Sequence, residues 1–174
     1  MFAVVGIVAA VTVVVVSRHD SSPGKGLTEV AQPNAAKVGQ AAPDFAIAGL
    51  DGATVHLADY RGKAVVLNFW ESWCHPCRQE FPLFRSALAS GKHDFVMVGV
   101  DTGDLRGDAR RFARQQHAEW PNGFDAGGTV ARGYGVDGLP QTFFIRADGV
   151  IASRVFRGLT RTELDHELDR LDAK

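Results

Sequence analysis

The chain is poor in cysteine: it has two in 174 residues, and both lie in Cys74-His75-Pro76-Cys77. A disulfide between residues so close in sequence closes a very small ring, and the stabilisation by a disulfide grows with the length of the loop it closes. A structural zinc site needs four ligands, and the histidines are scattered without a paired spacing. The sequence therefore does not predict a domain that is stabilised by a disulfide or by a metal ion. We expect no metal or organic cofactor.

The chain also lacks a strong net charge. Its formal net charge is −1, with 45% hydrophobic and 22% charged residues. Nucleic acid and anionic membrane surfaces attract basic proteins, so neither is expected as the main partner. The composition and length are those of one ordinary globular domain, and its partners are expected to be proteins.

Residues 2–16 contain no charged residue and end at Ser17-Arg18. A helix of about 17 residues is just long enough to cross a bilayer core of roughly 30 Å. The segment has no basic start, and Val15-Val16-Ser17 is only a tolerable cleavage site. We predict that residues 1–17 are a signal anchor or signal peptide, residues 18–40 a flexible linker, and residues 41–174 the folded domain.

The rest of the chain alternates strand and helix patterns, which predicts an α/β domain. Asp51-Gly52 and Asp148-Gly149 each separate two short apolar runs, as in β-hairpins. Residues 104–117 have apolar positions at helical spacing, namely Leu105, Ala109, Phe112 and Ala113. Thr160 and Glu163 form the pattern of a capping box at the start of a last helix.

The two cysteines lie where a predicted buried strand, residues 64–69, turns into a helix. Unpaired N–H groups and the helix dipole favour an anion in the first helical turn, and here that anion would be a thiolate. Pro76 fits the first turn, because its missing N–H has no helical partner there. We assign Cys74 as the more exposed attacking thiol and Cys77 as the resolving thiol.

Phe69-Trp70, Trp73-Cys74-x-x-Cys77 and the following Arg78-Gln79-Glu80-Phe81-Pro82 resemble the TlpA/ResA/CcmG group of membrane-anchored thiol-disulfide oxidoreductases. The resemblance implies a thioredoxin-like sandwich, with a central mixed sheet flanked by helices and an N-terminal β-hairpin. It also implies a monomer that reduces disulfides of partner proteins, such as cytochrome c maturation or copper-site cysteines. A membrane thiol protein would return the electrons, and the domain would lie on the extracytoplasmic (periplasmic) side, anchored or, after cleavage, secreted.

The resemblance extends to further site residues. Gly138-Leu139-Pro140-Gln141-Thr142-Phe143 looks like the cis-proline loop of this group, although a proline at the start of a strand is common in itself. Trp73, His75, Pro76, Leu139 and Pro140 are the implied substrate contacts.

A proton acceptor is the remaining part of the expected site. Asn68 stands where thioredoxins carry a buried carboxylate. Glu80 shares the helix face of Cys77 and resembles the glutamate that takes this role in the ResA-like branch. Its alternative is a solvated helix residue.

Two other functions stay open. A peroxiredoxin-type peroxidase shares the fold, but is expected to have a threonine shortly before its reactive cysteine and no cysteine two residues on. A non-catalytic docking module for haem or metal delivery is the other, although Cys-His-Pro-Cys-Arg is not the haem attachment pattern, which has histidine directly after the second cysteine.

Overall fold

A computed structural model describes residues 35–173. The predicted α/β alternation is confirmed. The elements in chain order are β1 (Ala46–Ala48), β2 (Thr54–His56), the 3₁₀ helix η1 (Leu57–Tyr60), β3 (Ala64–Trp70), α1 (His75–Ser90), β4 (Phe95–Asp101), α2 (Arg106–Gln115), β5 (Asn122–Phe124), α3 (Thr129–Tyr134), β6 (Gln141–Ile145), β7 (Ile151–Val155) and α4 (Arg161–Asp172).

The central sheet has five strands in the order β5-β4-β3-β6-β7. β3 and β4 are parallel, as are β4 and β5, whereas β6 is antiparallel to both β3 and β7. All seven residues of β3 are buried, which explains its continuous apolar run. The sheet is mixed, and both predicted Asp-Gly turns join antiparallel strands, β1 with β2 and β6 with β7.

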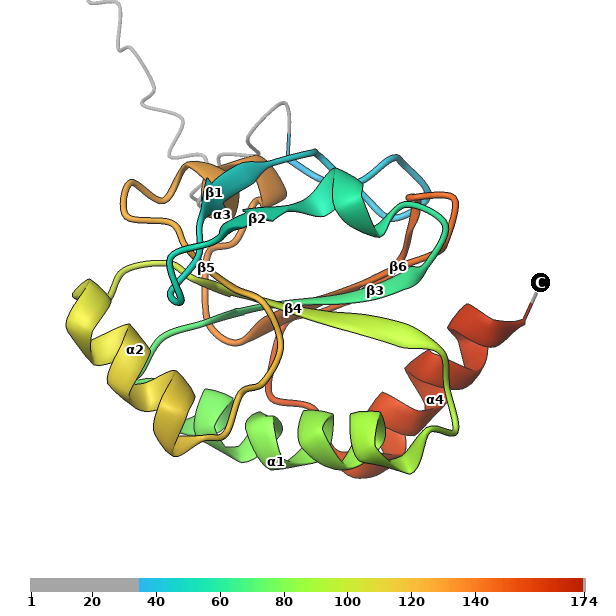
Figure 1. The fold of residues 1–174 in the computed structure, drawn as a ribbon. Helices are drawn as coiled ribbons and strands as arrows, with labels where there is room; N and C mark the ends of the chain where they lie inside the picture. Colours follow the sequence, from blue (N-terminus) through green and yellow to red (C-terminus); the bar gives the residue numbers. More distant parts are fainter. Residues whose placement is uncertain (1–34, 174) are drawn as a thin grey trace, which may run out of the picture. The chain divides into compact units, whose positions relative to one another are not determined.

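Helices α1, α2 and α4 cover one face of the sheet, while α3 and the β1–β2 hairpin lie on the other (Figure 1). Each face has its own hydrophobic core. The core under α1, α2 and α4 includes Trp70, both cysteines, Phe81 and Phe112. The second core, under the hairpin and α3, is centred on residues such as Phe69, Tyr134 and Phe143. The end of β3 thus places Trp70 and the cysteines on the face that α1 covers.

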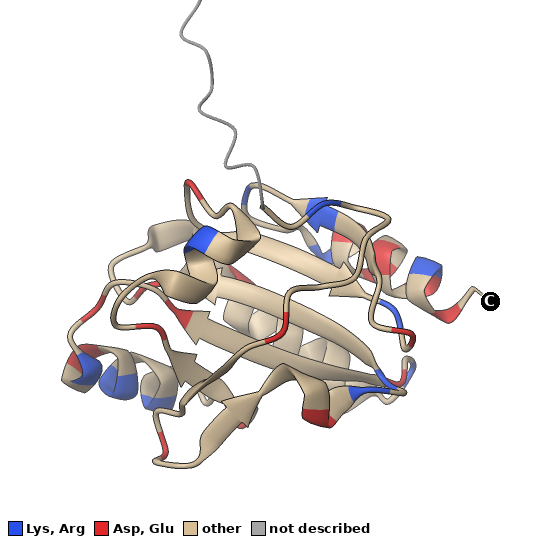
Figure 2. Ribbon diagram, turned by 90° about the horizontal axis from the view of Figure 1, so that it is seen from above, with Lys and Arg blue, Asp and Glu red and all other residues tan. Residues whose placement is uncertain are grey.

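Charged residues lie mainly on the helices and loops, and the strands of the central sheet are almost free of them (Figure 2). Both signs are mixed along the helices, in keeping with the net charge of −1.

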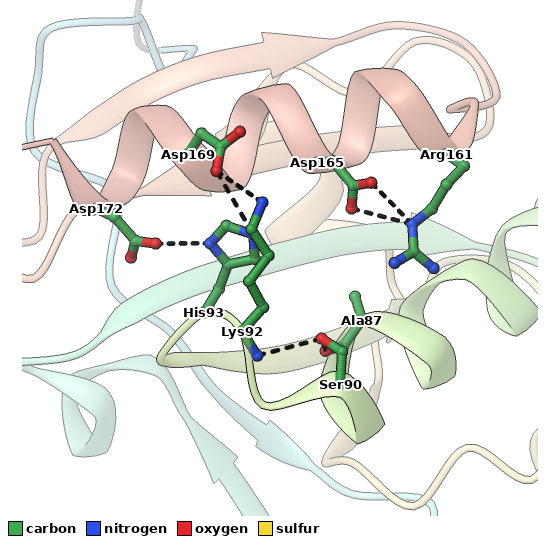
Figure 3. A network of polar contacts seen from close by, with 8 residues as sticks. All are labelled: Ala87, Ser90, Lys92, His93, Arg161, Asp165, Asp169 and Asp172. Carbon is green, nitrogen blue, oxygen red and sulfur yellow. Dashed lines mark hydrogen bonds and ion pairs between the residues drawn. The ribbon is translucent and has the colours of Figure 1, made fainter.

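A polar network holds helix α4 against the turn that follows α1 (Figure 3). His93 Nδ1 lies 2.6 Å from Asp172 Oδ2, and the imidazole is buried, with 3% of its side chain exposed. Lys92 Nζ lies 3.0 Å from Asp169 Oδ1. Thr160 and Glu163 form both bonds of the predicted capping box at the start of α4. These contacts stabilise the C-terminal helix, whose Leu164 and Leu168 are buried.

Two expectations about boundaries and burial are corrected. Leu105 was expected on the buried stripe of α2, but it precedes the helix and is 77% exposed. The linker was expected to run to residue 40. Instead Ala36 is buried and donates to Gly133 O, and Gly39 donates to Ile151 O, so packing against the domain begins before residue 41.

The predicted anchor or signal peptide lies outside the described residues. Within residues 35–173, no helix has the length and apolar character needed to cross a membrane.

Candidate active site

Cys74 and Cys77 form a disulfide at the junction of β3 and α1. Cys74 is the N-cap of α1, and its Sγ accepts a hydrogen bond from the Cys77 backbone N–H at 3.2 Å. Pro76 is the second residue of the helix, where it removes no helical hydrogen bond. The helix start therefore places an N–H donor on the Cys74 sulfur, which stabilises a thiolate there after reduction.

Both cysteines are buried in the disulfide form. Cys74 is 3% exposed and Cys77 is fully buried, so the predicted order of exposure holds only by a small margin. Around them, Trp73 is 69% exposed, and His75 and Pro76 are exposed as well. Exposed side chains therefore flank the buried Cys74 on both sides in the sequence.

The second predicted segment begins β6. The Leu139–Pro140 peptide bond is cis, as the motif predicts. Leu139 is half-buried and packs against the core cluster that contains both cysteines. Pro140 is buried directly before the first residue of β6.

A third segment, between β7 and α4, also approaches the cysteine motif. A Cβ atom placed on Gly158 would lie 3.4 Å from Cβ of Pro76. The next residue, Leu159, is buried, and its backbone N–H donates to Glu80 of α1. This segment was not predicted to be part of the site.

Glu80 is fully buried on α1, one helical turn after Cys77, and both its carboxylate oxygens are hydrogen-bonded. Oε1 accepts from the Leu159 backbone N–H at 2.9 Å, and Oε2 accepts from Asn68 Nδ2 at 3.2 Å. Burial raises the pKa of Glu80 to about 7, although both hydrogen bonds oppose the shift by stabilising the charged form. Glu80 is therefore not a solvated helix residue, and it can exchange a proton near neutral pH.

Asn68 links this carboxylate to the strand that follows Pro140. Its Nδ2 also donates to Thr142 Oγ1 at 2.9 Å, and all three side chains are buried. Asn68 Oδ1 has no hydrogen-bond partner among the described residues. The amide thus stands beside a titratable group without titrating itself.

Sequence reasoning missed Thr142 and Leu159 as neighbours of Glu80. Thr142 carried a signal, since it lies two residues after the predicted cis-proline, in the strand that follows it. Leu159 carried none, because it acts through its backbone N–H.

Within residues 35–173, no cluster of three or more His, Cys, Asp or Glu side chains is arranged to hold a metal ion.

The sheet, the helix-capping cysteine and the buried glutamate define the class: a thioredoxin-like fold carrying a dithiol/disulfide couple. A protein-family model described as the AhpC/TSA family matches residues 38–154. The chain belongs to this family.

Its relatives narrow the class to one activity. The chain is 31% identical over 136 residues to the thiol-disulfide oxidoreductase ResA of Bacillus thuringiensis, covering 78% of this chain and 79% of that one. It is 32% identical over 141 residues to ResA of Geobacillus thermodenitrificans, covering 80% and 81%. The protein is thus a ResA-like thiol-disulfide oxidoreductase, an enzyme that acts on proteins with disulfides.

Solved structures agree with this assignment. A Chlorobium tepidum protein assigned as the thiol:disulfide interchange protein DsbE has a TM-score of 0.73 and 36% identity, covering 79% of this chain and 99% of that chain. A secreted disulfide oxidoreductase of Mycobacterium tuberculosis has a TM-score of 0.67 and 29% identity, covering 73% and 96%. Both confirm the thioredoxin-like fold.

Proposed function

We propose that the protein is an extracytoplasmic reductant of disulfides in partner proteins, in which Cys74 attacks, Cys77 resolves and Glu80 accepts the proton of Cys77. The observation that carries the proposal is the buried Glu80, which lies one turn after Cys77 on helix α1 and has a pKa of about 7. A buried thiol loses its proton reluctantly. A base that titrates near neutral pH can accept this proton from Cys77.

The proposed reaction has two exchanges. The Cys74 thiolate attacks one sulfur of the substrate disulfide, which forms a mixed disulfide and releases the other substrate sulfur as a thiolate. Cys77 then passes its proton to Glu80 and attacks Cys74 Sγ, and the second substrate sulfur leaves. The substrate gains two electrons, the enzyme forms the Cys74–Cys77 disulfide seen here, and the two released thiolates take up protons.

In this proposal the residues around Cys74 contact the substrate. Trp73, His75 and Pro76 are exposed on one side. Leu139 and Pro140 offer the backbone before β6 on another side. The proposed substrates are disulfides in proteins of cytochrome c maturation or in copper-site proteins. A membrane thiol protein would return the electrons, and the enzyme would act as a monomer. Residues 1–17 would hold the domain at the membrane, or be cleaved to release it.

The test is the fate of a protein disulfide. Reduced protein should reduce insulin disulfides with a matching loss of its own thiols, and should consume hydrogen peroxide only slowly. Rapid peroxide turnover without insulin reduction would establish the peroxidase alternative instead. A docking module would show neither reaction. A measured Cys74–Cys77 potential below that of the substrate couple is required for reduction, and a much higher one would reverse the proposed direction.

A further inference from the structure

Two segments leave the sheet side by side just before the active-site cysteine. Trp70 and Asp101 are register partners at the ends of the parallel strands β3 and β4. After them, residues 71–73 lead to Cys74 and residues 102–105 lead to α2. The segment that delivers Cys74 therefore runs next to a loop that the reaction does not otherwise use.

The two segments are joined by side-chain hydrogen bonds to Asp104 and Glu71. Asp104 Oδ2 accepts from the Ser72 backbone N–H at 2.6 Å, and Asp104 Oδ1 accepts from Ser72 Oγ at 2.9 Å. Thr102 Oγ1 donates to Glu71 Oε1 at 2.7 Å. Hydrogen bonds to a carboxylate are shorter and stronger than neutral ones, so Asp104 holds Ser72 firmly by two atoms.

Ser72 is also held at its carbonyl group. Its oxygen accepts a hydrogen bond from the Arg78 guanidinium of α1. The N–H, hydroxyl and C=O of this one residue are thus all engaged, two positions before Cys74. The Cys74 N–H itself donates to Glu71 O at 3.1 Å.

The neighbouring Trp73 cannot anchor the segment by packing, because it is 69% exposed. Without the bonds to Asp104, the N–H and the hydroxyl of Ser72 would lose their partner on the loop before α2. Ser72 therefore anchors the segment that leads to Trp73 and to the buried Cys74.

Asp101 is a buried carboxyl group close to Asp104. It is fully buried, and neither carboxyl oxygen has a hydrogen-bond partner in normal geometry among residues 35–173. Burial, together with the neighbouring Asp104 and Glu71 carboxylates, raises the pKa of Asp101 to about 9. Close carboxylates do not all ionise, so Asp101 keeps its proton at neutral pH.

We propose that Asp104 is a positioning residue of the thiol-disulfide exchange: it holds Ser72 and so places Trp73 and the Cys74 sulfur for attack on an incoming disulfide. The inference rests on the proposed attack by Cys74. Exchange requires the attacking sulfur to be aligned with the disulfide, and a displacement of about 1 Å can cost on the order of 100-fold in rate.

Two simpler roles for Asp104 predict different results. If Asp104 acted only as a charge near Cys74, its neutralisation would lower the pKa of the thiol and leave the rate of the full thiolate unchanged. If Asp104 only stabilised the fold, its loss would lower the melting temperature without changing the exchange rate of the folded protein.

The experiment is a pH–rate profile for the reduced full-length chain with 2-hydroxyethyl disulfide, a small neutral probe. In Asp104→Asn, one carboxylate oxygen becomes an NH₂ group that cannot accept from Ser72. We expect the plateau rate, reached where Cys74 is fully ionised, to fall about 10-fold, within the range that misplacement produces. Asp108→Asn, on the first turn of α2 with its partner Arg111, should keep the parental plateau.

A double-mutant cycle with Ser72→Ala shows whether the two residues act together. Ser72→Ala removes only the hydroxyl bond, so its plateau should fall by a few-fold. Added to Asp104→Asn it should change less than it does in the parent, because the amide keeps only one acceptor oxygen for the two donors of Ser72. A parental plateau in Asp104→Asn, or fully multiplicative effects in the cycle, would overturn this inference alone. A parent that fails to attack the probe would overturn the proposed function with it.

Discussion

Glu80 Oε1 accepts a hydrogen bond from the Leu159 backbone N–H at 2.9 Å, across 79 positions of sequence. This bond ties the active-site helix α1 to the segment before α4. It also provides a buried carboxylate with a partner that cannot be removed by changing a side chain. The pKa of Glu80 also depends on its burial and on the hydrogen bond from Asn68, and the Asn68 side chain can be changed by substitution.

Glu80→Gln should slow resolution of the mixed disulfide by about 100-fold, the lower end of the usual contribution of a general base. It should also move the thiol titration to lower pH, because a negative charge near the thiolate is lost. Stopped-flow measurement of resolution and a thiol titration test both effects. Asp59→Asn, whose side chain is 68% exposed on η1, is the control. If both variants match the parent, Glu80 has no part in the reaction.

The variants Cys77→Ser and Cys74→Ser should differ in how much mixed disulfide they accumulate. Cys77→Ser should accumulate a mixed disulfide with the substrate protein, because Cys74 still attacks and nothing resolves the product. Cys74→Ser should accumulate almost none, since Cys77 is fully buried. Non-reducing electrophoresis after acid quenching measures this, with the doubly substituted chain as the blank. Stronger trapping by Cys74→Ser would reverse the assignment of the two thiols.

Asn68→Ala should raise the pKa of Glu80 above about 7, because the Asn68 hydrogen bond lowers it. The pH at which resolution is half-maximal should rise accordingly. The variant should also lose about 1–3 kcal/mol of unfolding free energy, since the buried hydroxyl of Thr142 and the Glu80 carboxylate each lose a partner. Thr142→Val is the matched control: it removes the neighbouring hydroxyl but leaves the bond to Glu80, so the pH midpoint should stay near that of the parent.

The stability of the oxidised protein should fall as pH rises from about 5 to 9. Burial raises the pKa of Asp101 from 3.8 to about 9 and that of Glu80 from 4.5 to about 7. Between these limits the folded protein binds more protons than the unfolded chain, so the free energy of unfolding decreases with pH.

Asp101→Asn should flatten this dependence, most clearly between pH 7 and 9, where Glu80 no longer contributes. Urea denaturation at a series of pH values measures the slope. Asp94→Asn, at an exposed position before β4, should keep the parental slope. Equal slopes in the parent and Asp101→Asn would show that the Asp101 carboxyl ionises normally in the folded protein.

Features that depend on neighbouring residues were predicted from the sequence. The two Asp-Gly turns, the capping box at Thr160 and the strand-to-helix junction at the cysteines all follow from local backbone preferences, and all are present. Leu105 was placed wrongly because helical spacing was extended one residue beyond the true start of α2. Periodicity locates the face of a helix better than its first residue.

The sequence by itself determined that a cysteine pair begins a helix after a buried strand, because that chemistry is contained in consecutive residues. Only the tertiary structure decided that Glu80 is buried, since its partners Asn68 and Leu159 come from β3 and from the segment before α4. The same holds for Asp104 and Ser72, which meet only because β3 and β4 are parallel neighbours. The sequence does not show which groups surround a carboxylate. The fold brings these groups together, and they set the pKa and the role of the carboxylate.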